Sequence, residues 1–287
     1  MQFKKLYEDP VIEESEFPPD SMAVVINSNS KNLYGVLYTV AGRGPHPAMV
    51  LLHGFPGTEK NLDMAHAFRR AGWNTLVFHY RGSWGSEGCF SFQNVLDDVK
   101  AAIEFVKSEE TARRYRIDRD NIVLLGHSMG GFATLLTAAD NMDIKAYVAI
   151  APFDFGAMGK NSEKDDKALR FLQEMFKECI IPLKGTTVEE LINEAIANSD
   201  KWSFVNNAEK LAEQKLLLIA AKKDNLSIPE LHYYPLLNKM LKYNTENFEY
   251  IMLNSDHSFQ DKRILLTEII ESWLEKQIKS ESNIKSF

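Results

Sequence analysis

The sequence predicts an α/β protein with a mostly parallel, eight-stranded sheet and helices on both faces. Short apolar runs typical of buried strands alternate with segments whose apolar residues recur at helical spacing. Gly-rich turns follow two of these strands, at residues 53–57 and 126–131. Repeated strand–helix units favour a parallel sheet, because right-handed crossovers place the connecting helices on both of its sides.

The expected strands are short and rich in Val, Ile, Leu and Tyr, which is typical of strands. They cover residues 21–27, 32–40, 48–54, 74–80, 121–126, 145–151, 215–221 and 248–254. The first two are separated by a polar turn, so we expect a hairpin that adds an antiparallel edge. The expected helices of the alternating part cover residues 62–71, 95–106, 130–139, 228–241 and 266–274.

The domain organisation is expected to be one core with an insertion. Residues 1–20 are acidic and end in Pro-Pro-Asp, which predicts an extended N-terminal arm. Residues 21–155 and 207–287 form the two parts of the core. The interval between Ala151 and Lys215 is too long for an ordinary crossover loop. We therefore predict a helical cap over residues 156–206, inserted after the sixth strand above the carboxyl edge of the sheet; the alternative is a bulky crossover with no role at the site.

Composition and charge exclude several partners. Apolar residues make up 45% and charged residues 25% of the 287 residues, as in globular proteins with a substantial core. The net charge of -7, with no basic stripe, disfavours a nucleic-acid partner. No run approaches the roughly 20 apolar residues of a membrane span, and the N-terminal stretch lacks the apolar core of a signal peptide. With only two cysteines, Cys89 and Cys179, we expect a cytoplasmic protein with no membrane partner.

The strongest motif is GHSMGG at residues 126–131, which contains Gly-x-Ser-x-Gly. It follows the apolar strand NIVLLG and opens a helix of small residues, the setting of a nucleophile elbow. Such a turn leaves no room for side chains beside Ser128, which explains the flanking glycines. We predict that Ser128 is the nucleophile; the alternative is a Gly-rich turn with a capping serine.

A serine hydroxyl needs a base, and enzymes with such an elbow carry the acid and then the histidine after the serine. His232 and His257 follow Ser128 in the chain. His232 falls inside a predicted helix, whereas His257 lies in a loop after the strand FEYIMLN. His257 is therefore the predicted base, and a surface loop histidine is the alternative interpretation.

Asp224 is the predicted acid, because it directly follows the strand KLLLIAA. Its role would be to orient the His257 ring and stabilise the imidazolium. Asp154, after the preceding strand, is the second candidate, and Asp256 is poorly placed because it adjoins His257. For each of them the alternative is a solvated loop carboxylate.

The backbone N–H groups of Phe55 and Met129 are the predicted oxyanion hole. Met129 follows the nucleophile, and Phe55 follows the strand AMVLLHG in the usual position of the second donor. Pro56 has no N–H and cannot serve. The alternative is that this Gly/Pro cluster is only a turn.

Several motifs together resemble an α/β-hydrolase over residues 21–278. They are HGFPG (53–57), YRGSWGSEG (80–88), GHSMGG (126–131), the Asp224 loop and NSDHSF (254–259). The chain resembles the group of bacterial esterases that includes cinnamoyl (feruloyl) esterases and prolyl-oligopeptidase-like hydrolases. The resemblance implies an α/β-hydrolase fold, and it implies that residues 81–88 support the oxyanion loop. The chain departs from this pattern in carrying Ala-Ala-Lys-Lys before Asp224, where relatives often have a glycine.

The expected activity is hydrolysis of a small-molecule ester or amide through an acyl-enzyme, with no cofactor and no metal. P-loop and dinucleotide-binding motifs and metal-ligand spacings are missing from the sequence. A carboxylesterase acting on small acyl or aromatic esters is favoured over an aminopeptidase or acyl-peptide hydrolase, and over a non-catalytic binding protein. Phe55, Phe171, Phe176 and Trp202 are candidate pocket residues, with burial in the core as the alternative. The chain is expected to be a monomer or homodimer.

Overall fold

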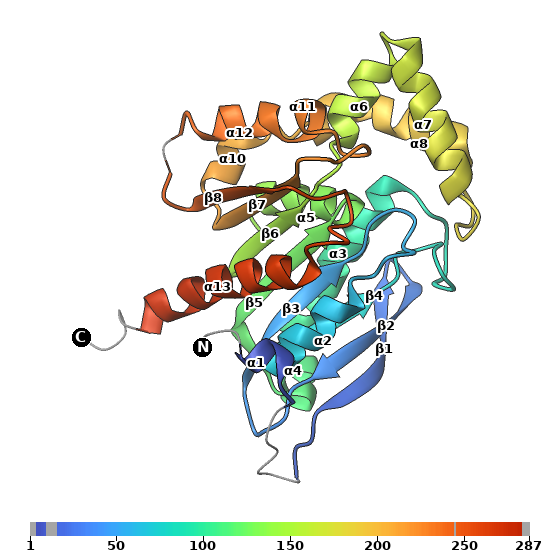
Figure 1. The fold of residues 1–287 in the computed structure, drawn as a ribbon. Helices are drawn as coiled ribbons and strands as arrows, with labels where there is room; N and C mark the ends of the chain where they lie inside the picture. Colours follow the sequence, from blue (N-terminus) through green and yellow to red (C-terminus); the bar gives the residue numbers. More distant parts are fainter. Residues whose placement is uncertain (1–3, 10–15, 244, 283–287) are drawn as a thin grey trace.

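The computed structural model describes residues 4–9, 16–243 and 245–282, and its centre is an eight-stranded sheet (Figure 1). The strands lie side by side in the order β1-β2-β4-β3-β5-β6-β7-β8. Their bounds are β1 Asp20–Ser28, β2 Lys31–Thr39, β3 His46–Leu52, β4 Asn74–Phe78, β5 Ile117–His127, β6 Ala146–Ile150, β7 Leu216–Ala221 and β8 Phe248–Leu253. Strand β2 is antiparallel to β1 and β4, and every pair from β4 to β8 is parallel. The predicted mostly parallel sheet is confirmed.

Helices cover both faces of this sheet. Helices α2 (Leu62–Ala71) and α13 (Arg263–Ser282) lie on one face, and α3 (Phe92–Lys107) and α5 (Met129–Ala139) lie on the other (Figure 1). Side chains of β3 alternate between the two resulting cores, with Met49 and Leu51 in one and Val50 and Leu52 in the other. Strands buried on both faces read as continuous apolar runs, which is why the sequence located them so well.

The N-terminal region differs from the prediction in its described part. Residues Lys4–Tyr7 form a short helix, α1, that packs against α2, and the Leu6 side chain is buried. An extended arm is therefore wrong for this segment, because burying Leu6 favours a local turn over an extended chain. Residues 1–3 and 10–15 of the predicted arm lie outside the described residues.

Five helices occupy the chain between β6 and β7. They are α6 Phe155–Ser162, α7 Asp166–Cys179, α8 Val188–Ala197, α9 Ser199–Trp202 and α10 Ala208–Ala212. Figure 1 shows α6, α7 and α8 gathered at one end of the molecule. The carboxylate of Glu194 in α8 accepts hydrogen bonds from the N–H groups of Phe92 and Gln93, at 2.8 and 2.9 Å. A negative charge at the N-terminus of α3 is favourable, so this contact anchors the insertion to the core.

The segment predicted as one helix over residues 228–241 is two helices, α11 (Pro229–His232) and α12 (Tyr234–Met240). The break falls at Tyr233, just before Pro235. Proline has no N–H to continue the helical hydrogen bonds and fits best in the first turn of a new helix. Helix α4 (Glu109–Tyr115), which was not predicted, begins at Ser108, whose hydroxyl accepts the Thr111 N–H.

The carboxyl ends of the central strands meet at one edge of the sheet. Leu52 of β3 pairs with Gly126 of β5, and His127 pairs with Ile150 of β6. The loops after β3, β5, β6, β7 and β8 therefore leave the sheet close together. In the part of the chain that the structure describes, no helix is long and apolar enough to cross a membrane.

Candidate active site

Ser128 sits on a strained turn between β5 and α5. Its backbone has φ 57° and ψ -117°, a conformation that costs a non-glycine residue free energy and is held by its surroundings. The Ser128 N–H donates to the carbonyl of Ile150 at 2.9 Å, which fixes the turn to the end of β6. The structure thus shows the strand–turn–helix setting that the sequence predicted.

Two glycines of the motif are required by close backbone contacts. A Cβ at Gly126 would lie 2.0 Å from the Gly130 carbonyl oxygen, and a Cβ at Gly130 would lie 2.3 Å from the Leu52 carbonyl oxygen. A side chain at Gly126 would push β5 away from α5, and a side chain at Gly130 would push the turn away from β3. The side chain of Ser128 is half-buried at the start of α5, where free N–H groups and the helix dipole favour negative charge.

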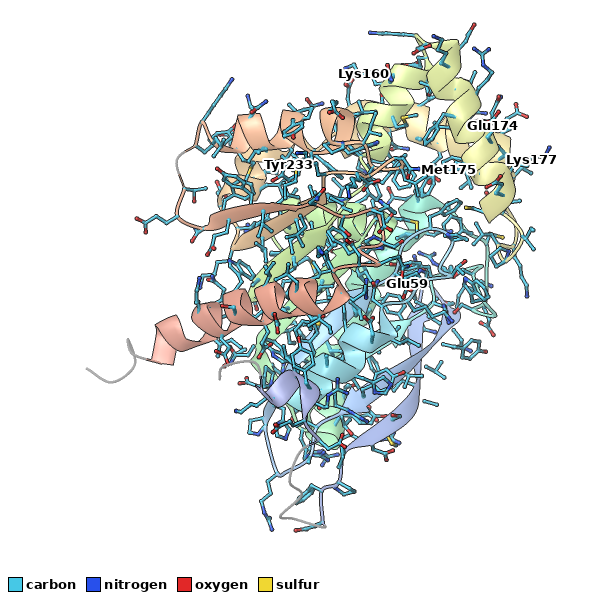
Figure 2. All side chains as sticks on the ribbon, viewed as in Figure 1. Glu59, Lys160, Glu174, Met175, Lys177 and Tyr233 are labelled. Carbon is cyan, nitrogen blue, oxygen red and sulfur yellow. The ribbon has the colours of Figure 1, made fainter. Side chains whose placement is uncertain are left out.

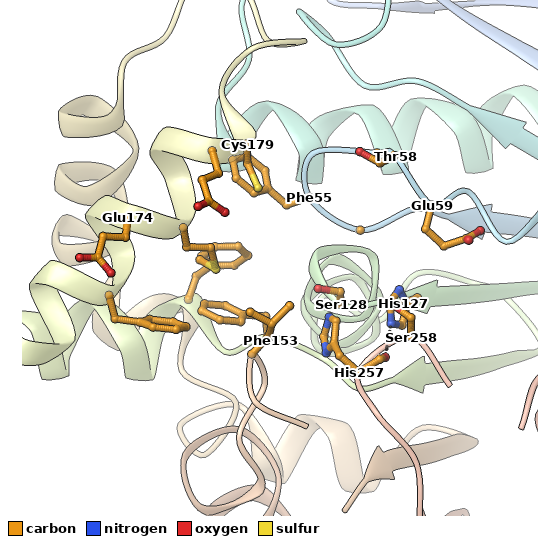
Figure 3. A pocket seen from close by; sticks show the side chains of 17 residues that line it. Phe55, Thr58, Glu59, His127, Ser128, Phe153, Glu174, Cys179, His257 and Ser258 are labelled. Atoms are coloured by element: carbon orange, nitrogen blue, oxygen red, sulfur yellow. Dashed lines mark hydrogen bonds between the residues drawn. The ribbon is translucent and has the colours of Figure 1, made fainter. Parts of the chain in front are cut away.

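His257 and Asp224 form a buried hydrogen-bonded pair. His257 Nδ1 lies 2.7 Å from Asp224 Oδ2. Because a carboxylate accepts, Nδ1 carries the proton and Nε2 is left with a lone pair. Figure 3 shows the His257 ring next to Ser128, and both residues line the same pocket. The three predicted residues are therefore brought together from the loops after β5, β7 and β8.

Asp224 is held in its charged form. Burial pushes the pKa of its carboxyl upward, but the hydrogen bond and charge of His257, with two backbone N–H groups, outweigh this effect and bring the pKa below its ordinary value. The N–H groups of Leu226 and Ser227 donate to Asp224 Oδ1 at 2.9 and 2.8 Å. The loop thus stabilises a carboxylate that faces the histidine.

The other candidates for acid and base have different partners. Asp154 caps α6: its carboxylate accepts the N–H groups of Ala157 and Phe204, at 2.8 and 3.0 Å. Burial raises the pKa of Asp154 to about 7. His232 Nδ1 accepts the Asp154 N–H, and burial lowers the pKa of His232 to about 3. The Asp256 carboxylate accepts the Gln260 N–H.

The loop that carries Phe55 passes directly over the nucleophile. A Cβ at Gly54 would lie 3.0 Å from Ser128 Cβ. This loop is tied down by the segment of residues 80–88: the Tyr80 hydroxyl donates to the His53 carbonyl at 3.1 Å, and Trp84 Nε1 donates to the Pro56 carbonyl at 2.7 Å. The loop is therefore fixed directly beside the nucleophile.

The pocket beside Ser128 has a volume of about 440 Å³ and is largely apolar. Its apolar wall combines Phe55 with residues of the loop after β6, the start of α6, helix α7 and the loop after β7. Figure 3 shows Phe55 and Phe153 between the serine and α7. The residues of this wall are Phe55, Phe153, Phe155, Phe171, Met175 and Leu226. Glu59, Glu174 and Glu178 also line the pocket.

The structure divides the predicted pocket residues into two groups. Phe55 and Phe171 line the pocket, whereas Phe176 and Trp202 are fully buried in the core. Phe176 packs against Phe55, and Trp202 packs edge-on against Phe132 of α5. The sequence reasoning missed Phe153 and Phe155, although their position just after a central strand could have indicated them.

Among residues 4–9, 16–243 and 245–282, no group of three or more His, Cys, Asp or Glu side chains is arranged to hold a metal ion.

A family model described as serine aminopeptidase, S33, matches residues 43–216. Among curated proteins, the quorum-quenching protein AidA of Acinetobacter baumannii is 32% identical over 145 residues, or 48% of this chain and 46% of that protein. The chain spans about half the length of the first curated relatives it matches, 46% for AidA and 57% for an uncharacterized 31.7 kDa protein of Escherichia coli.

Two kinds of solved structure share the fold. The esterase Pf2001 of Pyrococcus furiosus is 18% identical, with a TM-score of 0.66, over 94% of this chain and 96% of that one. Est1E of Butyrivibrio proteoclasticus, solved with ferulic acid bound, is 17% identical, with a TM-score of 0.63, over 90% of this chain and 100% of that one. At these identities the likeness concerns the fold alone.

Proposed function

The chain belongs to the serine aminopeptidase (S33) family of α/β hydrolases, and from this premise we propose that it is a serine esterase. Its substrates are carboxylic esters with small acyl or aromatic groups. The single observation that carries the proposal is the His257–Asp224 hydrogen bond of 2.7 Å beside a serine on a strained elbow. A capping serine in an ordinary turn would need neither this strain nor a buried imidazole–carboxylate pair at its side.

The mechanism is acyl transfer in two steps. Ser128 Oγ attacks the ester carbonyl while His257 Nε2 takes its proton, and Asp224 stabilises the imidazolium through Nδ1. The N–H groups of Phe55 and Met129 stabilise the oxyanion, a contribution of about 10²–10³ in rate for each such donor. His257 then protonates the leaving alcohol, and a water molecule releases the acyl group by the same route.

The pocket supports the substrate class. Phe153, Phe155 and Phe171 give a wall that favours flat or branched apolar acyl groups over charged ones. A volume of about 440 Å³ is in the range of small-molecule pockets.

A second candidate function is that of an aminopeptidase or acyl-peptide hydrolase. Glu174 and Glu178, one helical turn apart on α7, both face the pocket. Their carboxylates could bind the ammonium group of an amino-acid substrate. The description of the matching family supports this candidate as well.

A paired assay separates the two. Nitrophenyl esters of increasing acyl size and of aromatic acids are compared with aminoacyl nitroanilides, and Ser128→Ala serves as the inactive control. We expect turnover of the esters, with the largest kcat/KM for acyl groups that fill the aromatic wall. Turnover of the nitroanilides alone would favour the peptidase. Ester turnover that persists in Ser128→Ala would overturn the proposed mechanism.

A further inference from the structure

His127 lies beside both the nucleophile and the base (Figure 3). It is the last residue of β5, directly before Ser128, and only 4% of its surface is exposed. Its Nε2 is 2.8 Å from the carbonyl oxygen of His257, and the two imidazole rings are 4.8 Å apart (Figure 3). The ring thus touches the base residue both through its backbone and through its side chain.

The direction of this hydrogen bond follows from chemistry. A carbonyl oxygen only accepts, so His127 Nε2 carries the proton and donates it. The Nδ1 atom is buried and has no hydrogen-bond partner among the described residues. Burial lowers the pKa of His127 to about 3, so the ring stays neutral at ordinary pH. The His127 ring is therefore neutral and has one N–H donor, Nε2, which faces the His257 carbonyl.

Three backbone carbonyl groups of the loop that carries His257 accept hydrogen bonds from other segments. The Lys223 N–H donates to Ser255 at 2.9 Å, Arg263 Nη1 donates to Ser258 at 3.2 Å, and His127 donates to His257 itself. The first two contacts come from the acid loop and from the start of α13. The contact from His127 comes from the residue next to the nucleophile and acts on the base residue directly.

We propose that His127 is a positioning residue that sets the distance between the Ser128 hydroxyl and the His257 ring. The inference rests on the proposed function, because it assigns His127 a role through His257. Strand β5 places both Ser128 and the His127 ring, so the hydrogen bond to the His257 carbonyl ties the base to the same rigid strand end as the nucleophile. A misplacement of about 1 Å at such a site can cost about 10²-fold in rate.

The test uses variants that separate the donor from the shape of the ring. His127→Phe keeps an aromatic ring and removes the donor. His127→Gln places an amide N–H near the position of Nε2, whereas the shorter side chain of His127→Asn does not reach it. His66→Gln, on α2 against Tyr38 and outside the pocket, is the matched control.

Three readouts are measured: kcat and KM on the best ester of the panel, thermal unfolding, and the proton NMR signal of the His257–Asp224 hydrogen bond. We expect His127→Phe to lower kcat about 10²-fold with KM unchanged, and to weaken or shift the NMR signal. His127→Gln should restore both, His127→Asn should not, and His66→Gln should match the unaltered protein.

Two results would overturn the inference. One is a His127→Phe variant with unaltered kcat and an unaltered NMR signal. The other is equal impairment of the Gln and Phe variants, which would mean that the donor is irrelevant. If His127→Phe does not fold, the comparison of His127→Gln with His127→Asn tests the inference in its place. The NMR signal needs no turnover, so it tests His127 even if the unaltered protein hydrolyses no ester and the proposed function fails.

Discussion

The nucleophile elbow and helix α7, which face each other across the pocket, differ in how tightly their residues are packed. All residues of α5 are buried, and the backbone approaches at Gly126 and Gly130 leave no space for a single added carbon. In α7 only Ala168, Leu172 and Phe176 are buried. Figure 2 shows Lys177 on the outer side of α7, away from the body of the molecule.

This difference separates the chemistry of the site from its selectivity. The reacting groups come from loops whose positions are fixed by β3, β5, β7 and β8, all in the parallel part of the sheet. The wall that contacts the substrate comes partly from α7, a helix with one buried stripe. The insertion that carries α7 is anchored to the core through Glu194 of α8 and is held internally by the hydrogen bond from Phe204 to Asp154. Substitutions at the sheet edge should therefore abolish activity or folding, and substitutions on α7 should change which substrates are accepted.

The largest effect is expected for the acid of the proposed triad. Asp224→Asn keeps the shape but lets the side-chain amide donate toward His257 Nδ1, which disfavours the required tautomer. We expect kcat to fall by about 10⁴-fold with the thermal unfolding temperature little changed. Steady-state kinetics on a nitrophenyl ester measure this.

Asp256→Asn is the matched control. Asp256 adjoins His257 in the chain, but its carboxylate accepts a hydrogen bond from the Gln260 N–H and not from the imidazole. Equal losses in the two variants would remove the special role of Asp224.

The next effect concerns the fit of the elbow against β3. A methyl group at Gly130→Ala would meet the Leu52 carbonyl oxygen at 2.3 Å, so the turn must shift. We expect a loss of about 1–3 kcal/mol in the free energy of unfolding together with a loss of turnover. Urea denaturation measures the loss of stability, and an ester assay measures the loss of turnover. A Gly130→Ala protein with unaltered stability and activity would show that the elbow can adapt to an added methyl group despite the close contacts.

Acid stability offers a third test of the rigid region. Burial lowers the pKa of His53, His127 and His232 to about 3, from an ordinary value of 6.5. The unfolded chain binds more protons than the folded one below pH 6.5, so stability falls as the pH drops, by about 1.4 kcal/mol per pH unit for each fully neutral histidine. Burial also raises the pKa of Asp154 to about 7 and raises the pKa values of Asp98 and Glu194, which acts in the opposite direction. Burial lowers the pKa of His79 to about 4, which adds to the effect of the three histidines.

We therefore expect the free energy of unfolding to decrease steeply between pH 6.5 and 5. Denaturant titrations across this range measure it. Constant stability would mean that these imidazoles are solvated or charged in the folded protein.

The smallest effect is expected on α7. Met175→Ala and Phe171→Ala enlarge the pocket at α7, where both side chains lie outside the buried stripe of the helix. The ratio of kcat/KM between a large and a small acyl ester should change by about tenfold, with little change in stability. Lys177→Ala, on the outer side of the same helix, should leave the ratio unaltered. If all three variants behave alike, α7 has no part in selectivity.

The sequence predicted the sheet and the relative positions of Ser128, Asp224 and His257 because each depends on local patterns. Continuous apolar runs mark buried strands, and the residues that follow their carboxyl ends share one edge. Asp224 and Asp154 both follow such strands, and only the fold shows that the Asp154 carboxylate binds the Phe204 N–H instead of a histidine.

The remaining features depend on contacts between distant segments. Trp202 and Phe176 have the same apolar character as Phe171, and their place in the core depends on how the insertion packs on α3 and α5. The hydrogen bond from His127 to His257 joins residues 130 positions apart. The sequence pattern marked the position of His127 in the motif but gave no sign of its partner.

The central claim is that Ser128 is the nucleophile activated by the His257–Asp224 pair. The most direct test is labelling with a fluorophosphonate probe, followed by mass spectrometry of the peptides. The account predicts a single labelled peptide that contains Ser128, loss of the label in Ser128→Ala, and much slower labelling in His257→Ala. Labelling at another residue, or equally fast labelling of the His257→Ala protein, would contradict it.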